Sequence, residues 1–188
     1  MAQRVVNGEQ YQAVLLGGDV DGASISVDGR AYRSVVSFNR PGNASGYTAG
    51  DVVGGATSAI HTFSGIGPSG GSVLAQSASL LIGKTAVPSG MAGFRLHLFN
   101  SSPSAVADNA VFNVASGEID AYMGHVDFPT PIDMGDVLFA QVDYIGRQLK
   151  LASGQTSIFA ELETRGAYTP ASGTAYQVRM STLEVGLA

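Results

Sequence analysis

The chain has 188 residues, of which 45% are apolar and 13% are charged, and its net charge is −5. This length suits one domain with a sizeable core, and the low charge content excludes general disorder. An acidic chain with scattered arginines is not expected to bind nucleic acid, and the absence of cysteine excludes disulfides, thiolate metal sites and a cysteine nucleophile.

Residues 1–30 differ from the rest of the chain. Glycine and aspartate interrupt short apolar pieces there, at residues 17–22 and at Asp28-Gly29. Such pieces can pair as a small hairpin or lie extended along a neighbour. We therefore expect an N-terminal arm at 1–30 and one domain at 31–188. No stretch has the apolar core of a secretory signal or approaches the roughly 20 apolar residues of a membrane span, so no membrane partner is expected.

Alternating apolar and polar residues predict strands through the rest of the chain. The clearest case is 94–99, where Phe94, Leu96 and Leu98 point to one face of a strand and Arg95 and His97 to the other. One face of such a strand is apolar and the other is wettable. The remaining predicted strands are 32–40, 59–63, 73–82, 119–128, 137–149, 158–163 and 176–181.

The same alternation assigns apolar faces to the longer strands. In 73–82 the predicted inward residues are Leu74, Ala78, Leu80 and Ile82, with Gln76 as an exception. In 137–149 they are Leu138, Ala140, Val142 and Tyr144. The longest polar connection is 100–109, and one helical turn is expected at 103–108.

About eight closely spaced strands with long connections favour an all-β, antiparallel β-sandwich of jelly-roll type with an N-terminal extended arm. The strand order does not follow from the sequence. No repeat of fixed period is present, which excludes a propeller or a solenoid.

The three histidines are His61, His97 and His125, each on a different predicted strand. A jelly-roll metal site needs about three converging imidazoles, and no His-x-His spacing supports convergence. We expect no metal, and we expect His97, beside Arg95 on the polar face, to lie at the surface.

His125 and Asp127 share one face of a predicted strand, which suggests a hydrolytic centre as a rival hypothesis. A hydrolase would add a serine and an oxyanion hole, but no serine lies in a Gly-x-Ser-x-Gly turn. A simple hydrogen bond between the two side chains, or their solvation, is the favoured interpretation.

The remaining carboxylates and glycines have ordinary explanations. Asp19 and Asp21, with Asp28 downstream, resemble part of a calcium loop but lack its closing glutamate. Glu161 and Glu163 are expected on the solvated face of an edge strand, not across a glycosidase cleft. The glycine-rich residues 65–71 precede a strand and not a helix, so they form no phosphate loop. No cofactor is expected.

Three segments, 46–54, 93–109 and 166–174, together resemble a family of tailed-phage virion proteins, and 117–131 fits the same pattern. The resemblance covers roughly residues 32–185. It implies a jelly-roll β-sandwich on the outer surface of the phage head, made in the host cytoplasm. It also implies a decoration, or cement, protein that binds the major capsid protein, commonly as a homotrimer, with no catalytic residues to carry over.

The contact residues follow from position in the chain. Strand addition by the apolar arm to a neighbour's sheet would add main-chain hydrogen bonds, and Arg4, Tyr11, Arg30 and Arg33 are the expected capsid contacts. The alternative is a head-fibre or tail-tip module that binds host glycans through aromatics beside loops 64–72 and 100–109, namely Phe63 and Phe99.

Overall fold

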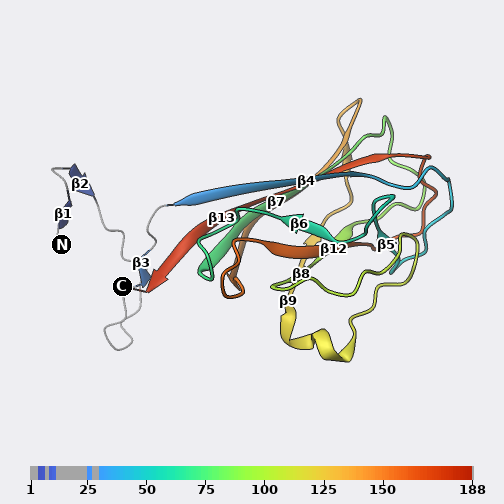
Figure 1. Ribbon diagram of the computed structural model, residues 1–188. Coiled ribbons are helices and arrows are strands. Elements are labelled where there is room, and N and C mark those ends of the chain that lie inside the picture. The colour runs from blue at the N-terminus through green and yellow to red at the C-terminus, as the bar shows by residue number, and fades with distance from the viewer. Residues whose placement is uncertain (1–3, 7–8, 12–24, 27–29, 188) are drawn as a thin grey trace.

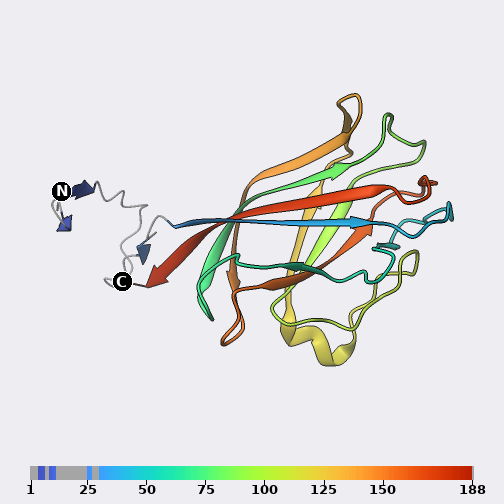
Figure 2. The same cartoon turned by 45° about the horizontal axis from the view of Figure 1, so that its top comes forward.

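The computed structural model describes residues 4–6, 9–11, 25–26 and 30–187, and it describes side chains from Arg30 to Val185. Strands dominate the described residues, with one 3-10 helix, η1 (Ser116–Ala121). Two sheets lie face to face, as Figures 1 and 2 show. Among the described residues, no helix is long and apolar enough to cross a membrane.

The first sheet contains the longest strands of the chain. Its main path runs β10-β11-β7-β13, β4 also pairs with β13, and every pairing is antiparallel. The bounds of these strands are β4 (Ala31–Asn39), β7 (Ser72–Ile82), β10 (Ile132–Asp133), β11 (Leu138–Lys150) and β13 (Ala175–Leu187).

The second sheet is shorter and has β12 at its centre. Its path runs β5-β12-β8-β9, and β6 pairs with the first residues of β12, on the same side as β5. The bounds are β5 (Val52–Val53), β6 (His61–Phe63), β8 (Phe94–Phe99), β9 (Tyr122–Phe128) and β12 (Ile158–Thr164).

The connection of these strands is that of a jelly roll. The chain passes from β4 in the first sheet to β6 in the second, back to β7, across to β8 and β9, back to β11, across to β12 and finally to β13. The two four-stranded layers are thus β4-β13-β7-β11 and β6-β12-β8-β9, which is the double-sheet order of a jelly roll. The predicted fold class is confirmed.

The core lies between the two sheets. The predicted inward residues of β8 and β12, such as Leu96 and Leu162, are fully buried there, as are Val178 and Met180 of β13. These side chains alternate with outward neighbours along each strand, as a two-layer sandwich requires. The alternation in 94–99, 158–163 and 176–181 therefore predicted the inward faces correctly.

Two bulges overturn parts of the predicted faces. Between the pairs Ser181–Ser77 and Thr182–Ala75 the register skips Gln76, so Val73 and Ala75 point inward in place of Leu74. In β11 the register shifts between Asp143 and Arg147, and Tyr144 is 96% exposed instead of inward. An extra residue in a strand inverts the facing of everything beyond it, which alternation alone does not reveal.

The segment between β8 and β9 also differs from expectation. Residues 103–108 form no helical turn, and the helical turn of this segment is η1, over the first residues of the predicted strand 119–128. Glu118, in the first turn of η1, accepts a hydrogen bond from the Ser104 N–H at 2.6 Å and ties the two ends of the segment together.

The described pieces before Arg30 are short strands. β1 (Arg4–Val6) pairs with β2 (Glu9–Tyr11), and β3 (Ile25–Ser26) pairs with the end of β13. Much of the expected arm, including Asp19, Asp21 and Asp28, lies outside the described residues. The division at residue 30 stays a prediction.

Candidate interaction surfaces

The outer face of the second sheet carries a ladder of polar side chains. Cross-strand pairing sets His97 of β8 between Glu161 of β12 and His125 of β9. The next row sets Arg95 between Glu163 and Asp127. The sequence therefore places its acidic, basic and imidazole groups side by side across three strands.

His97 is buried, at 4% exposure, so its predicted surface position is wrong. Its Nε2 lies 2.7 Å from Glu163 Oε2, and its Nδ1 lies 3.0 Å from the Tyr122 hydroxyl. A neutral ring satisfies both partners by donating from Nε2 to the carboxylate and accepting the tyrosine proton at Nδ1. Burial lowers the pKa of His97, against the opposing pull of Glu163, and favours this neutral ring.

The two glutamates are buried too, and the predicted solvated edge is wrong because β12 is the central strand of its sheet. Glu163 is satisfied by His97 and by the Arg165 guanidinium at 2.8 Å. Glu161 is fully buried, and only its Oε1 is bonded, to the Val106 N–H at 3.1 Å. Its Oε2 has no hydrogen-bond partner among the described residues, and burial raises the pKa of Glu161 to about 7.

The cover over this face is the segment 100–121, which joins β8 to β9. Phe112 stacks on the His97 ring at a centroid distance of 3.6 Å, and the Val106 amide caps Glu161. In Figure 1 the segment runs along the side of the second sheet away from the first. The apolar residues within this polar connection, Val106 and Phe112 among them, are the sequence signal that a cover exists.

A buried ion pair anchors the cover to the end of β4. Arg40 is 1% exposed, and its Nη2 lies 3.2 Å from Asp108 Oδ2. Asp108 Oδ1 also accepts the Tyr47 hydroxyl at 2.6 Å and the Gly54 N–H at 3.0 Å. Sequence reasoning missed this network, because its members lie up to 68 positions apart.

The His125–Asp127 pair lies at the open margin of the same face. His125 Nε2 is 3.5 Å from Asp127 Oδ2, and Asp127 is held mainly by Arg95 through bonds of 2.7 and 3.0 Å. This guanidinium lowers the pKa of Asp127. Over residues 30–185, no serine hydroxyl is hydrogen-bonded to His125, and no group of three or more potential ligands is placed to hold a metal ion. Asp127 thus belongs to a surface ion pair with Arg95, and His125 lies beside it.

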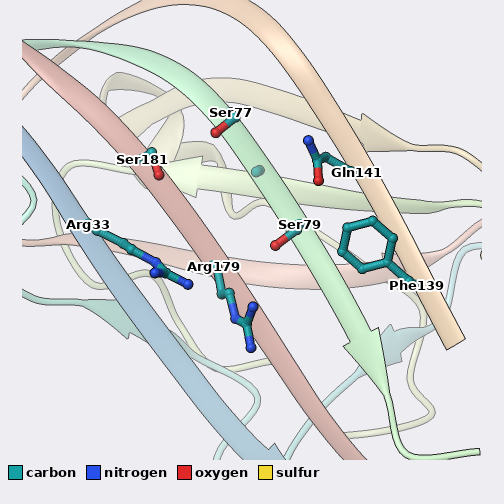
Figure 3. A pocket seen from close by; sticks show the side chains of 8 residues that line it. Arg33, Ser77, Ser79, Phe139, Gln141, Arg179 and Ser181 are labelled. Carbon is teal, nitrogen blue, oxygen red and sulfur yellow. The ribbon is translucent and has the colours of Figure 1, made fainter. Parts of the chain in front are cut away.

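The outer face of the first sheet has no such cover among the described residues. Its outward side chains run in rows across four strands: Val35, Arg179, Ser79 and Gln141 form one row, and Arg33, Ser181, Ser77 and Asp143 form the next. All eight are exposed or half-buried. Small hydroxyl side chains at the centre of the face leave a shallow hollow of about 280 Å³, shown in Figure 3.

The hollow has a positive side. Arg33 and Arg179 reach along it from β4 and β13, as Figure 3 shows, with Ser77 and Ser79 on β7 opposite them. Arg179 donates from Nε to the Gln177 side chain at 2.7 Å, which fixes the orientation of its guanidinium. Asp143 is occupied by the Gln141 amide, at 2.7 and 2.9 Å. Arginine and hydroxyl donors together suit a carboxylate or another oxyanion.

Tyr144 lies at the bulge of β11, directly after Asp143. It is 96% exposed and has a φ of 56°, a left-handed conformation that is uncommon for a bulky residue. An aromatic ring held out in water at a strained position is typical of a contact residue at an interface.

The expected capsid contacts are spread over the molecule. Arg33 lines the hollow, and Arg30 is exposed at the entry to β4, where its carbonyl accepts the Glu184 N–H. Arg4 begins β1 and Tyr11 ends β2, and their side chains lie outside the described part of the chain. Phe63 and Phe99, the aromatics expected to meet a glycan, are 0% and 1% exposed and present no ring to a sugar.

No protein-family model and no curated protein matches the chain. Among solved structures it is similar to a chain of Desmodium yellow mottle tymovirus, with 10% identity, 95% of this chain and 96% of that chain covered, and a TM-score of 0.31. It is also similar to a chain of an Israeli acute paralysis virus particle, with 11% identity, 100% and 85% covered, and a TM-score of 0.32. Likenesses this low carry no conclusion, so the fold rests on the chain's own strand order.

Proposed function

We propose that this chain is a non-enzymatic structural protein of a tailed-phage virion, a decoration protein that binds the outer surface of the head. The observation that carries the proposal is the outer face of the β4-β13-β7-β11 sheet, which no described segment of the chain covers. On the opposite outer face the chain's own segment 100–121 covers His97 and Glu161, whereas this face keeps its arginines, its serines and the neighbouring Tyr144 in reach of a partner.

The chemistry of the face supports binding and not catalysis. Arg33 and Arg179 offer donors to the carboxylates of a capsid subunit, and the serines between them allow close approach of a main chain. Tyr144 would bury its exposed ring against the same subunit. Repetition of this contact around a shell would turn modest single affinities into firm attachment. From the resemblance of 46–54, 93–109 and 166–174 to phage virion proteins, we take the major capsid protein as the proposed partner and a homotrimer as the proposed bound form.

The test uses purified phage heads that lack this protein. The wild-type chain should sediment with the heads, and the double variant R33S/R179S should lose most of this binding. The matched control K84S/K150S removes two positive charges outside the hollow and should bind like wild type. Failure of the wild type to bind, or equal loss in both double variants, would contradict the proposal. Sedimentation equilibrium of the free protein tests the trimer.

A further inference from the structure

The margin of the sandwich where β4 lies is open for main-chain pairing. β4 is nine residues long, its single sheet partner among the described strands is β13, and it contains no proline, lysine or bulge. These are the features with which proteins usually block an exposed strand. Within the described chain, its other side therefore presents unpaired main-chain amides and carbonyls from Arg33 to Ser37, and only beyond them does the Asn39 carbonyl accept the Ala56 N–H.

The register identifies these groups. At the two ends of β4, the Arg40 N–H donates to the Thr174 carbonyl and the Glu184 N–H donates to the Arg30 carbonyl. Even-numbered residues of β4 thus form the hydrogen-bonded pairs with β13, since the register is continuous between those ends. Arg33, Val35 and Ser37 direct their N–H and C=O groups away from β13, and within the described chain none of these groups has a main-chain partner.

A second hollow, of about 320 Å³, lies directly beside this row, between β4 and β6. Val36 and Phe38 of β4 line it on one side and Ile60 and His61 on the other. Phe38 is held there in a stack, 4.1 Å from the His61 ring and 5.2 Å from the Tyr176 ring. The hollow can take an apolar side chain on the inward face of any strand added to β4.

The outward face of the same row carries positive charge. Val35 is 46% exposed, and Arg33 and Arg179 flank it on the outer surface. A strand added to β4 would present every second side chain to these arginines, so acidic residues at those positions would be favoured. A second copy of this chain, paired through its own β4, would instead bring four arginines together with no acid between them.

We propose that β4 is a strand-addition site for an extended segment of a partner polypeptide in which apolar residues alternate with acidic residues. The apolar residues enter the hollow beside Phe38, the acidic residues meet Arg33 and Arg179, and the main chain pairs with Arg33, Val35 and Ser37. Main-chain bonds supply affinity and the alternating side chains supply specificity. The site deepens the proposed function, on which it rests for the identity of the partner as a capsid subunit.

The direct test uses the full chain and an acetylated, amidated peptide Thr-Val-Asp-Val-Asp-Val-Thr, with no phage head present. Binding is followed by NMR shifts of the β4 amides. Three results are expected: shifts at Arg33, Val35 and Ser37, no binding by a peptide N-methylated on its pairing edge, and at least tenfold weaker binding when lysine replaces aspartate in the peptide. An absence of shifts at millimolar peptide, or equal binding by the N-methylated peptide, would overturn the proposal.

Two variants at one position separate main chain from side chain. V35P removes the Val35 N–H, which faces away from β13, so no hydrogen bond to β13 is lost. This variant should weaken peptide binding at least tenfold. V35T keeps the amide and the β-branched shape and should stay within about threefold of wild type. Equal binding by V35P and V35T would overturn the strand-addition site. A concentration-dependent dimer that V35P abolishes would overturn the choice of a partner peptide over a second copy.

Measurements on heads then separate this site from the proposed function. Loss of head binding by V35P but not by V35T places the strand-addition site in the capsid contact. Peptide binding without any head binding by the wild type retains the site and rejects the capsid partner. Head binding that R33S/R179S abolishes and V35P leaves intact retains the proposed function and rejects strand addition to the capsid.

Discussion

The two outer faces of this sandwich use the same alternation of residues for opposite purposes. On the β9-β8-β12 face, His97, Glu161 and Glu163 are buried beside the segment 100–121, and His97 is hydrogen-bonded to Glu163 and Tyr122. On the β4-β13-β7-β11 face, arginines and hydroxyl groups lie open around a hollow. The covered face should therefore govern stability, and the open face should govern binding, since only the second keeps unused donors in reach of a partner.

The anchor of the cover gives the largest expected effect. D108A removes the acceptor for Arg40, Tyr47 and Gly54 and leaves the buried Arg40 guanidinium without a carboxylate, bonded only to neutral groups of Tyr47 and Asn43. We expect the free energy of unfolding to fall by about 3–5 kcal/mol. Urea denaturation measures it. D143A removes an exposed carboxylate of the open face and should change stability by less than about 0.5 kcal/mol. Similar losses in both variants would break the distinction between the faces.

The unpaired carboxylate beneath the cover makes stability depend on pH. Glu161 has a pKa of about 7 in the folded protein, above the 4.5 of an unperturbed glutamate. The unfolded chain therefore loses its proton first, and stability falls as the pH rises from about 4.5 to 7.

E161Q keeps an oxygen for the Val106 amide and should abolish this part of the pH dependence. At pH 8 the variant should be more stable than wild type by about 1–3 kcal/mol, the scale of one buried unsatisfied group. At pH 4 the difference should vanish. Thermal unfolding of both proteins is measured from pH 4 to 8. The difference between their stabilities at each pH cancels the contributions of the other titrating groups. A difference independent of pH would show that Glu161 does not carry the effect.

A matched pair of phenylalanines sharpens the comparison further. Phe112 and Phe139 are both half-buried, but Phe112 stacks on His97 in the cover and Phe139 lines the open hollow. F112A should lower the free energy of unfolding by about 1–2 kcal/mol, and F139A should lower it by less than about 1 kcal/mol. Because F112A admits water to the ring, the lowered pKa of His97 should also rise toward its ordinary value, as an NMR titration would show. An unchanged pKa would mean that Phe112 does not shield the ring.

The smallest effect on stability is expected on the open face. R33S/R179S should change the free energy of unfolding by less than about 0.5 kcal/mol, because neither guanidinium is buried. The same variant should lose head binding while it stays folded. A loss of binding accompanied by unfolding would show that these arginines have a structural role instead. Thermal melts followed by circular dichroism measure the stability of the variant, and sedimentation with heads measures its binding.

Much of the fold followed from local pattern. Strand β8 was predicted with its observed ends, and the inward residues of β12 and β13 were predicted correctly, because neighbours two apart in a strand share a face. The site was less accessible. Arg33 was expected as a contact, but its neighbour Arg179 was placed only on a polar face, because the two are joined by a pairing between strands far apart in the chain.

The sequence by itself determined that this chain forms two-faced strands, which side of most strands turns inward, and that the fold is a sandwich. Alternation is a property of adjacent residues, so it can be read from the chain alone. The tertiary structure decided which polar face is buried. His97 and Glu161 are hidden because the segment 100–121 folds over them, and Arg40 is hidden because Asp108, 68 positions later, meets it. Whether a polar side chain meets water or another segment depends on contacts that no local pattern encodes.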